Sequence, residues 1–192
     1  MPTTFTLQFP AEEIQELAAR FGSLDESPLL AIGAAARGRG HYTRPEFIEV
    51  CAWKTHRSRP KISSNTEAEV IAVTGRALAA TDEGARMQAL LELTGVGVPT
   101  ASTLLYAGYP ADYPILDVRA LESLGVRPRS QYPVSFWLEY LDACREIARG
   151  NRVSIRTLDK ALWQRSKELA RTSASSPGRT RASFPARTRA NG

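Results

Sequence analysis

The chain has 192 residues, of which 43% are hydrophobic and 23% charged, and this composition is that of one ordinary globular domain. Two cysteines are too few for a disulfide framework, and together with two histidines they exclude a zinc site or a four-cysteine iron–sulfur cluster. We expect both cysteines to be buried free thiols. The longest apolar run is too short to span a membrane and no N-terminal signal pattern is visible, so we expect a soluble intracellular protein with no membrane association.

The net charge of +5 is unevenly distributed along the chain. Residues 172–192 contain four arginines and no acidic residue, so they account for four of the five positive charges. This stretch is rich in Ser, Arg, Pro, Thr and Ala without a periodic apolar face, which predicts a disordered basic tail after a folded domain at 1–171. The tail is either an arm that adds phosphate contacts or a solvated terminus without a role.

Helical periodicity runs through the whole folded part, and no segment alternates as a strand does. Capping boxes at Thr43/Glu46 and Ser64/Glu67 and a capping aspartate at Asp82 mark three of the helix starts. The segments that we expect to be helical are 11–21, 28–37, 43–53, 64–78, 82–93, 99–107, 118–124, 134–149 and 155–170. The sequence therefore predicts an all-α bundle of about eight to ten helices.

A helix-hairpin-helix element is predicted at residues 87–108. An apolar helix ends near Thr94, Gly95-Val96-Gly97 forms a tight turn, and a second helix begins with Pro99 in its first turn. The backbone N–H groups of the turn and of the first helical residues can converge on a phosphate, helped by the helix dipole. The alternative is an ordinary helical hairpin, but we favour phosphate binding by Gly95, Val96, Gly97, Val98 and Thr100.

The stretch from Leu93 to Asp117 resembles the signature of the helix-hairpin-helix (HhH-GPD) base-excision DNA glycosylases. Leu-Thr-Gly-Val-Gly, then Thr100-Ala101, and later Tyr-Pro-Ile-Leu-Asp are similar to that family's Leu-Pro-Gly-Val-Gly, Lys-Thr-Ala and Pro-Val-Asp. The wider stretch that holds the motif, residues 90–125, covers about a fifth of the chain. Cys-Ala-Trp-Lys at 51–54 and Leu-Trp-Gln at 162–164 also look like an uncharacterised bacterial branch of the superfamily. The resemblance implies that Asp117 is the catalytic carboxylate and that the fold is the family's helical bundle.

Such a carboxylate would act on the sugar from which the base leaves. Cleavage of an N-glycosidic bond develops positive charge on the sugar, and a nearby carboxylate can stabilise this charge and orient or deprotonate the attacking water. The target base would be flipped out of the duplex into a pocket. An Asp that directly precedes a helix is also a favoured N-cap, and both roles can hold for Asp117.

Two departures from the family pattern shape the expected activity. The family members that also cut the DNA backbone carry a lysine where this chain has Pro99, so we expect a monofunctional hydrolase without lyase activity. Leu-Asp-Val-Arg replaces the commoner Val-Asp-Thr-His, which leaves open a non-catalytic DNA-binding module. A nuclease is disfavoured, because no cluster of Asp, Glu and His resembles a two-metal site.

A basic stretch follows the helix that ends near Trp53. We expect the cations Lys54, Arg57, Arg59 and Lys61 to contact DNA phosphates, although cations also complement a helix C-terminus. Lys54 is in addition a candidate for a relocated amine nucleophile. Trp53 can stack on a base or pack in the core.

Candidate base-pocket residues are Trp53, Tyr113 and Tyr132, the two tyrosines because they flank the Asp117 region in predicted loops. We expect a monomer in the cytoplasm that associates with the nucleoid and binds duplex DNA with a flipped base. We expect no metal and no cofactor, although the hairpin can accommodate a monovalent cation. The sequence identifies neither the base nor a choice between repair of self-DNA and attack on modified foreign DNA.

Overall fold

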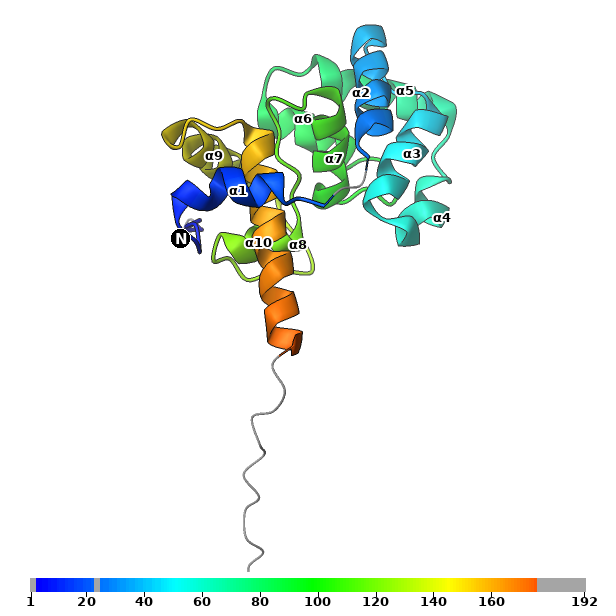
Figure 1. Ribbon diagram of the computed structural model, residues 1–192. Coiled ribbons are helices and arrows are strands. Elements are labelled where there is room, and N and C mark those ends of the chain that lie inside the picture. Colours follow the sequence, from blue (N-terminus) through cyan, green and yellow to red (C-terminus); the bar gives the residue numbers. More distant parts are fainter. Residues whose placement is uncertain (1–2, 23–24, 176–192) are drawn as a thin grey trace, which may run out of the picture.

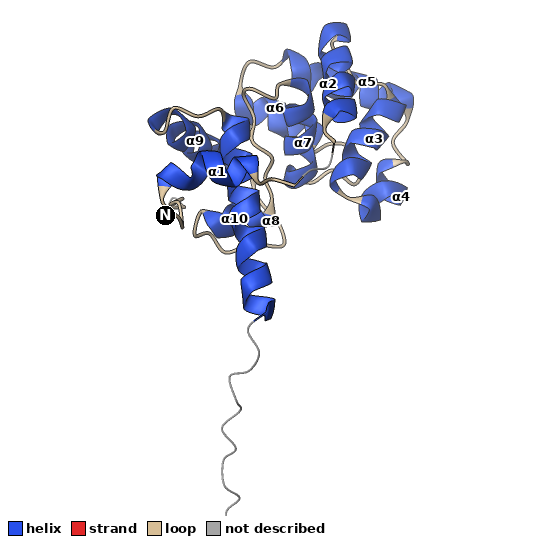
Figure 2. Cartoon of the chain, in the orientation of Figure 1, coloured by secondary structure: helices blue, strands red, loops and turns tan. Residues whose placement is uncertain are grey.

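The computed structural model describes residues 3–22 and 25–175, and within them the protein is all-helical, with ten α-helices, two short 3₁₀ helices and no strand (Figures 1 and 2). The α-helices are α1 (Ile14–Ala19), α2 (Ser27–Arg39), α3 (Arg44–Lys54), α4 (Arg59–Ile62), α5 (Glu67–Ala79), α6 (Glu83–Leu90), α7 (Val98–Gly108), α8 (Val118–Ser123), α9 (Val134–Gly150) and α10 (Ile155–Ser175). The 3₁₀ helices are η1 (Ala11–Glu13) and η2 (His56–Ser58). The predicted all-α class is confirmed.

Two of the three predicted helix starts are correct and one is displaced. Thr43 forms a capping box with Glu46, and Asp82 caps α6 by accepting a hydrogen bond from the N–H of Ala85 at 2.7 Å. The second box joins Thr66 to Glu69, not Ser64 to Glu67. Ser64 instead donates its hydroxyl to the carbonyl of Lys61, because it belongs to the turn after the short helix α4.

The helix α7 lies at the centre of one half of the molecule, packed against α2, α3 and α6 (Figure 1). All of its described apolar side chains are buried apart from the half-buried ring of Pro99. At Gly33 of α2 a side chain would overlap the carbonyl of Ala107, so glycine there lets the two helix backbones touch. The hydroxyl of Tyr42, two residues before α3, donates to the carbonyl of Leu104 at 2.8 Å, which connects the start of α3 to α7.

The helix α10 organises the other half, where it packs against α1, α8 and α9 (Figure 1). It runs to Ser175, past residue 172 at which the basic tail is predicted to begin. The remainder of the predicted tail, 176–192, lies outside the described residues. The two free cysteines are buried, Cys51 in α3 and Cys144 in α9, as predicted.

Candidate functional site

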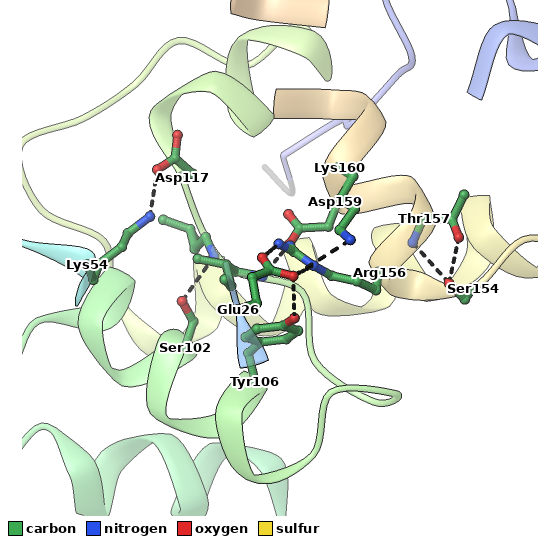
Figure 3. A network of polar contacts seen from close by, with 12 residues as sticks. Glu26, Lys54, Ser102, Tyr106, Asp117, Ser154, Arg156, Thr157, Asp159 and Lys160 are labelled. Atoms are coloured by element: carbon green, nitrogen blue, oxygen red, sulfur yellow. Dashed lines mark hydrogen bonds and ion pairs between the residues drawn. The ribbon is translucent and has the colours of Figure 1, made fainter. Parts of the chain in front are cut away.

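Asp117 stands at the N-terminus of α8, in contact with a lysine from a distant helix. Its Oδ1 accepts a hydrogen bond from the N–H of Arg119 at 2.9 Å, so Asp117 is the N-cap of α8. Its Oδ2 lies 2.5 Å from Nζ of Lys54, the last residue of α3 (Figure 3). The side chains of Lys54 and Asp117 are 14% and 27% exposed. The structure thus places the predicted catalytic aspartate in contact with Lys54, which the sequence suggested as a phosphate contact or an amine nucleophile.

A cavity of about 190 Å³ opens beside this ion pair. It is lined by Phe21, Gly22, Trp53, Lys54, Ile115, Asp117, Arg156, Asp159 and Trp163. The volume is below the ~300–1,000 Å³ typical of sites for drug-sized ligands, so the cavity suits one small ring system. Three aromatic side chains together with charged groups give it the character of a site that receives a flat, polar molecule.

Of the three predicted base-pocket residues, Trp53 lines the cavity and the two tyrosines do not. Trp53 is half-buried, and its Nε1 is buried without an acceptor among the described residues. Tyr113 is buried in the core, where it packs nearly parallel to Trp137 and donates its hydroxyl to Glu83. Tyr132 packs on Phe136, away from the cavity lining. Nearness to Asp117 in the sequence does not bring the side chain of Tyr113 to the cavity, because residues 113–116 are buried in the core.

Sequence reasoning missed a second set of charged residues in the cavity wall. Asp159 and Arg156, both from α10, line the cavity, and Arg156 also contacts Glu26, just before α2 (Figure 3). Tyr106 donates its hydroxyl to Glu26 at 3.2 Å, and Nζ of Lys160 lies 3.7 Å from the same carboxylate. A signal existed in the sequence, since Asp159 interrupts the apolar face that Leu158 and Leu162 share on α10.

The two carboxyl groups of the cavity have opposite electrostatic environments. Burial raises the pKa of Asp117. The charge and hydrogen bond of Lys54, with a smaller contribution from Arg119, outweigh this effect, so the pKa of Asp117 is below its usual value. For Asp159, burial raises the pKa, and Arg156 and the N–H of Ile115 offset this in part, so the pKa stays above its usual value. The two groups therefore differ in their tendency to hold a proton, the pattern by which paired carboxyl groups divide acid and base roles.

The predicted hairpin is present, with α6 and α7 joined by a turn at 91–97. Gly95 has φ +81°, and an added Cβ would lie 2.9 Å from Cβ of Lys61, so this position requires glycine. Gly97 is the exposed N-cap of α7, and no acceptor among the described residues bonds the N–H groups of Gly97 and Val98. The side chains of Val96, Val98 and Thr100 are buried, so these residues contribute backbone rather than side chains to a surface.

The basic stretch abuts the hairpin through Asn65. The buried amide of Asn65 accepts from the N–H of Thr94 at 2.8 Å and donates to the Thr94 carbonyl at 2.9 Å and the Ile62 carbonyl at 2.8 Å. These bonds hold α4 against the hairpin turn. The predicted phosphate contacts at α4 and η2 therefore fall into one exposed group, Arg57, Arg59 and Lys61, next to the turn, whereas Lys54 lies apart in the cavity.

A buried hydroxyl connects the hairpin helix to the segment that carries Asp117. Ser102 of α7 donates to the carbonyl of Pro99 at 2.8 Å and accepts from the N–H of Leu116 at 2.9 Å (Figure 3). Asp159 accepts from the N–H of Ile115, and Tyr140 donates to the Ile115 carbonyl. The two residues just before Asp117 are thus held by hydrogen bonds from three helices, α7, α9 and α10.

The described residues hold neither a metal-binding cluster nor a membrane-spanning helix. No three or more His, Cys, Asp and Glu side chains in this part of the chain are grouped so that they could bind a metal ion. No helix within the same residues is long and apolar enough to cross a membrane.

Comparison with known proteins assigns neither a family nor a function to the chain. No protein-family model matches the chain, and neither a curated protein nor a solved structure matches it significantly.

Proposed function

We propose that the protein is a DNA N-glycosylase that releases a damaged or modified base, with Asp117 as its catalytic carboxylate. The observation that carries this proposal is the cavity itself. A carboxylate kept ionised by Lys54 lies in the wall of a space of about 190 Å³ between aromatic rings. Ser102 connects the residue before this carboxylate to the hairpin helix α7, whose N-terminal amides have no acceptor among the described residues. The resemblance of residues 93–117 to the HhH-GPD glycosylases points to the same activity.

DNA binding in this proposal uses backbone amides and exposed cations together. The N–H groups of Gly97 and Val98 bind a phosphate at the N-terminus of α7, where the helix dipole favours an anion. Arg57, Arg59 and Lys61 are exposed on the adjoining segment and contact neighbouring phosphates. Binding of this kind weakens steeply as the salt concentration rises, because phosphate contacts release counterions.

Catalysis follows from the charge that develops on the sugar. The target base is flipped into the cavity and stacks against aromatic rings such as Trp53 and Trp163. As the bond between the base and C1′ breaks, Asp117 stabilises the positive sugar and orients a water molecule for attack. Lys54 holds this carboxylate in its charged form and in position. Because position 99 is proline, we propose hydrolysis without strand cleavage.

The rival function is a DNA-binding module without catalysis, and a base-release assay separates the two. Duplex oligonucleotides that each carry one lesion or modified base are incubated with the protein and then treated with alkali, which cleaves at abasic sites. We expect release from at least one substrate, and loss of that release in Asp117→Asn with duplex binding retained. Duplex binding without release from any substrate would favour the module, and full activity of the variant would refute the role of Asp117.

Several further properties belong to the same proposal. We propose that the protein acts as a monomer in the cytoplasm, associated with the nucleoid, and without a metal or organic cofactor. The hairpin turn can accommodate a monovalent cation beside the bound phosphate.

A further inference from the structure

Asp159 is the most deeply buried charged residue in the cavity wall. Its side chain is 5% exposed, compared with 27% for Asp117. The two carboxyl groups reach the same cavity from different elements, Asp159 from α10 and Asp117 from the N-terminus of α8. In the proposed complex, a nucleotide whose sugar lies at Asp117 can present its base to Asp159, because both side chains border the same cavity.

One of the two oxygen atoms of Asp159 has no hydrogen-bond partner in the described part of the chain. Oδ2 accepts from the N–H of Ile115 at 3.4 Å and from the guanidinium of Arg156. Oδ1 accepts no hydrogen bond from the residues that the structure describes. The atom lies on a side chain that borders the cavity, so a bound base can supply the partner.

We propose that Asp159 is the general acid that protonates the departing base. This inference rests on the proposed glycosylase activity and extends it to the leaving group. Without protonation, a neutral base must leave as an anion, which is a poor leaving group. A carboxylic acid positioned beside the base removes this difficulty by transferring a proton to it.

The charged groups around Asp159 are compatible with this role. The titratable groups that face it are Arg156 and Lys160 on α10, Lys54 on α3, Asp117 before α8, Glu26 before α2, Tyr106 on α7, and Tyr140 and Cys144 on α9. The charge of Arg156 is shared between Asp159 and Glu26, which limits how far it can stabilise ionised Asp159. Burial is the largest effect and holds the pKa of Asp159 above its usual value.

The step balances as follows. The C1′–N bond breaks and its electron pair goes to the base, while the proton of Asp159 goes to a ring nitrogen or oxygen of that base. Water attacks C1′ on the face of Asp117 and loses a proton to solvent. The neutral base and an abasic sugar leave, and ionised Asp159 regains a proton from water. No oxidant or other co-reactant takes part.

The test compares two classes of leaving group. A cationic base such as 7-methylguanine leaves as a neutral molecule and needs no proton, whereas a neutral lesion does. Single-turnover rates at saturating protein separate chemistry from binding. We expect Asp159→Asn to release the neutral base about 100-fold more slowly, within the range of general acid catalysis, and the cationic base within about threefold of the wild type. Asp117→Asn should lose both.

Matched variants guard against loss of folding. Asp142→Asn makes the same chemical change on the exposed face of α9 and should act like the wild type. Asp159→Glu retains an acid and should recover part of the neutral-base rate. If Asp159→Asn does not fold, the wild-type pH profile decides. Release of the neutral base must fall as the pH rises through the pKa of Asp159, and release of the cationic base must not.

The outcomes distinguish the inference from the proposed function. Three results would overturn the role of Asp159 and leave the glycosylase intact. They are equal slowing of both leaving groups in Asp159→Asn, equal pH profiles for the two leaving groups, and release of cationic bases alone by the wild type. Absence of any release by the wild type would overturn the glycosylase and, with it, the general acid.

Discussion

Nζ of Lys54 lies 2.5 Å from Oδ2 of Asp117, although 63 positions separate the two residues in the chain. The contact joins the end of α3 to the start of α8 inside the cavity. It makes the ionisation of Asp117 depend mainly on Lys54, because burial raises the pKa of this carboxyl group and Arg119 lowers it less than Lys54 does. The consequences of this pair can be measured.

Replacement of Lys54 by glutamine should make base release sensitive to acid. With Lys54 present, the pKa of Asp117 is below its usual value, so the carboxylate stays ionised between about pH 5 and 8. Without it, burial raises the pKa, and the rate should fall as the pH is lowered through the new value. The measurement is the single-turnover rate against pH for both proteins. As a control, Arg149→Gln removes an exposed cation from α9 and should keep the pH profile of the wild type. An unchanged pH profile in Lys54→Gln would contradict the role of the ion pair.

Lys54 should not form a covalent adduct with DNA. Its amine donates a hydrogen bond to Asp117, and an ammonium group in this position has no free electron pair with which to attack C1′. Incubation with substrate DNA and borohydride, followed by denaturing electrophoresis, should therefore show no trapped complex. A trapped complex that disappears in Lys54→Gln would establish lyase activity from a lysine outside the hairpin, and would replace water as the nucleophile.

The charge at position 97 should control DNA affinity. Gly97 has φ −107°, and an added Cβ would meet nothing closer than Cδ of Pro99 at 3.9 Å, so side chains fit here without strain. Gly97→Glu and Gly97→Gln differ by one negative charge beside the N–H groups of Gly97 and Val98. We expect the glutamate variant to bind duplex DNA at least about tenfold more weakly than the glutamine variant in moderate salt. Equal dissociation constants would remove the hairpin from the binding surface.

The two glycines of the turn should respond differently to alanine. At Gly95 the positive φ and the contact with Lys61 oppose a side chain, so Gly95→Ala should lower the free energy of unfolding by about 1–3 kcal/mol. Gly97→Ala should stay within about 0.5 kcal/mol of the wild type. Denaturant unfolding of the three proteins, followed by circular dichroism, provides the comparison. A similar loss in both variants would mean that the turn is not held against α4 as described.

Local sequence signals predicted the helices well, because capping and periodicity act within a few residues. The displaced capping box shows where such signals are ambiguous. Ser64/Glu67 and Thr66/Glu69 both satisfy the pattern, and the choice depends on α4, a one-turn helix whose burial of Ile62 comes from tertiary packing. The hairpin was predictable for the same local reason, since its glycines and Pro99 are consecutive in the chain.

The cavity could be predicted only in part, because its walls come from four distant segments. Asp117 and Trp53 were found through motifs, whereas Phe21 comes from the segment just after α1, and Asp159 and Trp163 come from α10. No local pattern indicates that α1 and α10 pack together and bring these residues to α3. Tyr113 illustrates the opposite error, since nearness in sequence to Asp117 gave no information about the direction of its side chain.

The hydroxyl of Ser102 fixes the distance between the N-terminus of α7 and the segment that carries Asp117. Through Pro99 and Leu116 it connects the first turn of α7 to the residue before Asp117. In our proposal, the separation between the bound phosphate and the reacting sugar is therefore set by the protein, and the DNA must match it. Undamaged, well-stacked duplex resists the distortion that this requires. In our proposal, nucleotides whose stacking is already weakened reach the cavity at the lowest cost, so selection of the substrate begins with the stiffness of the DNA, before any contact reads the base.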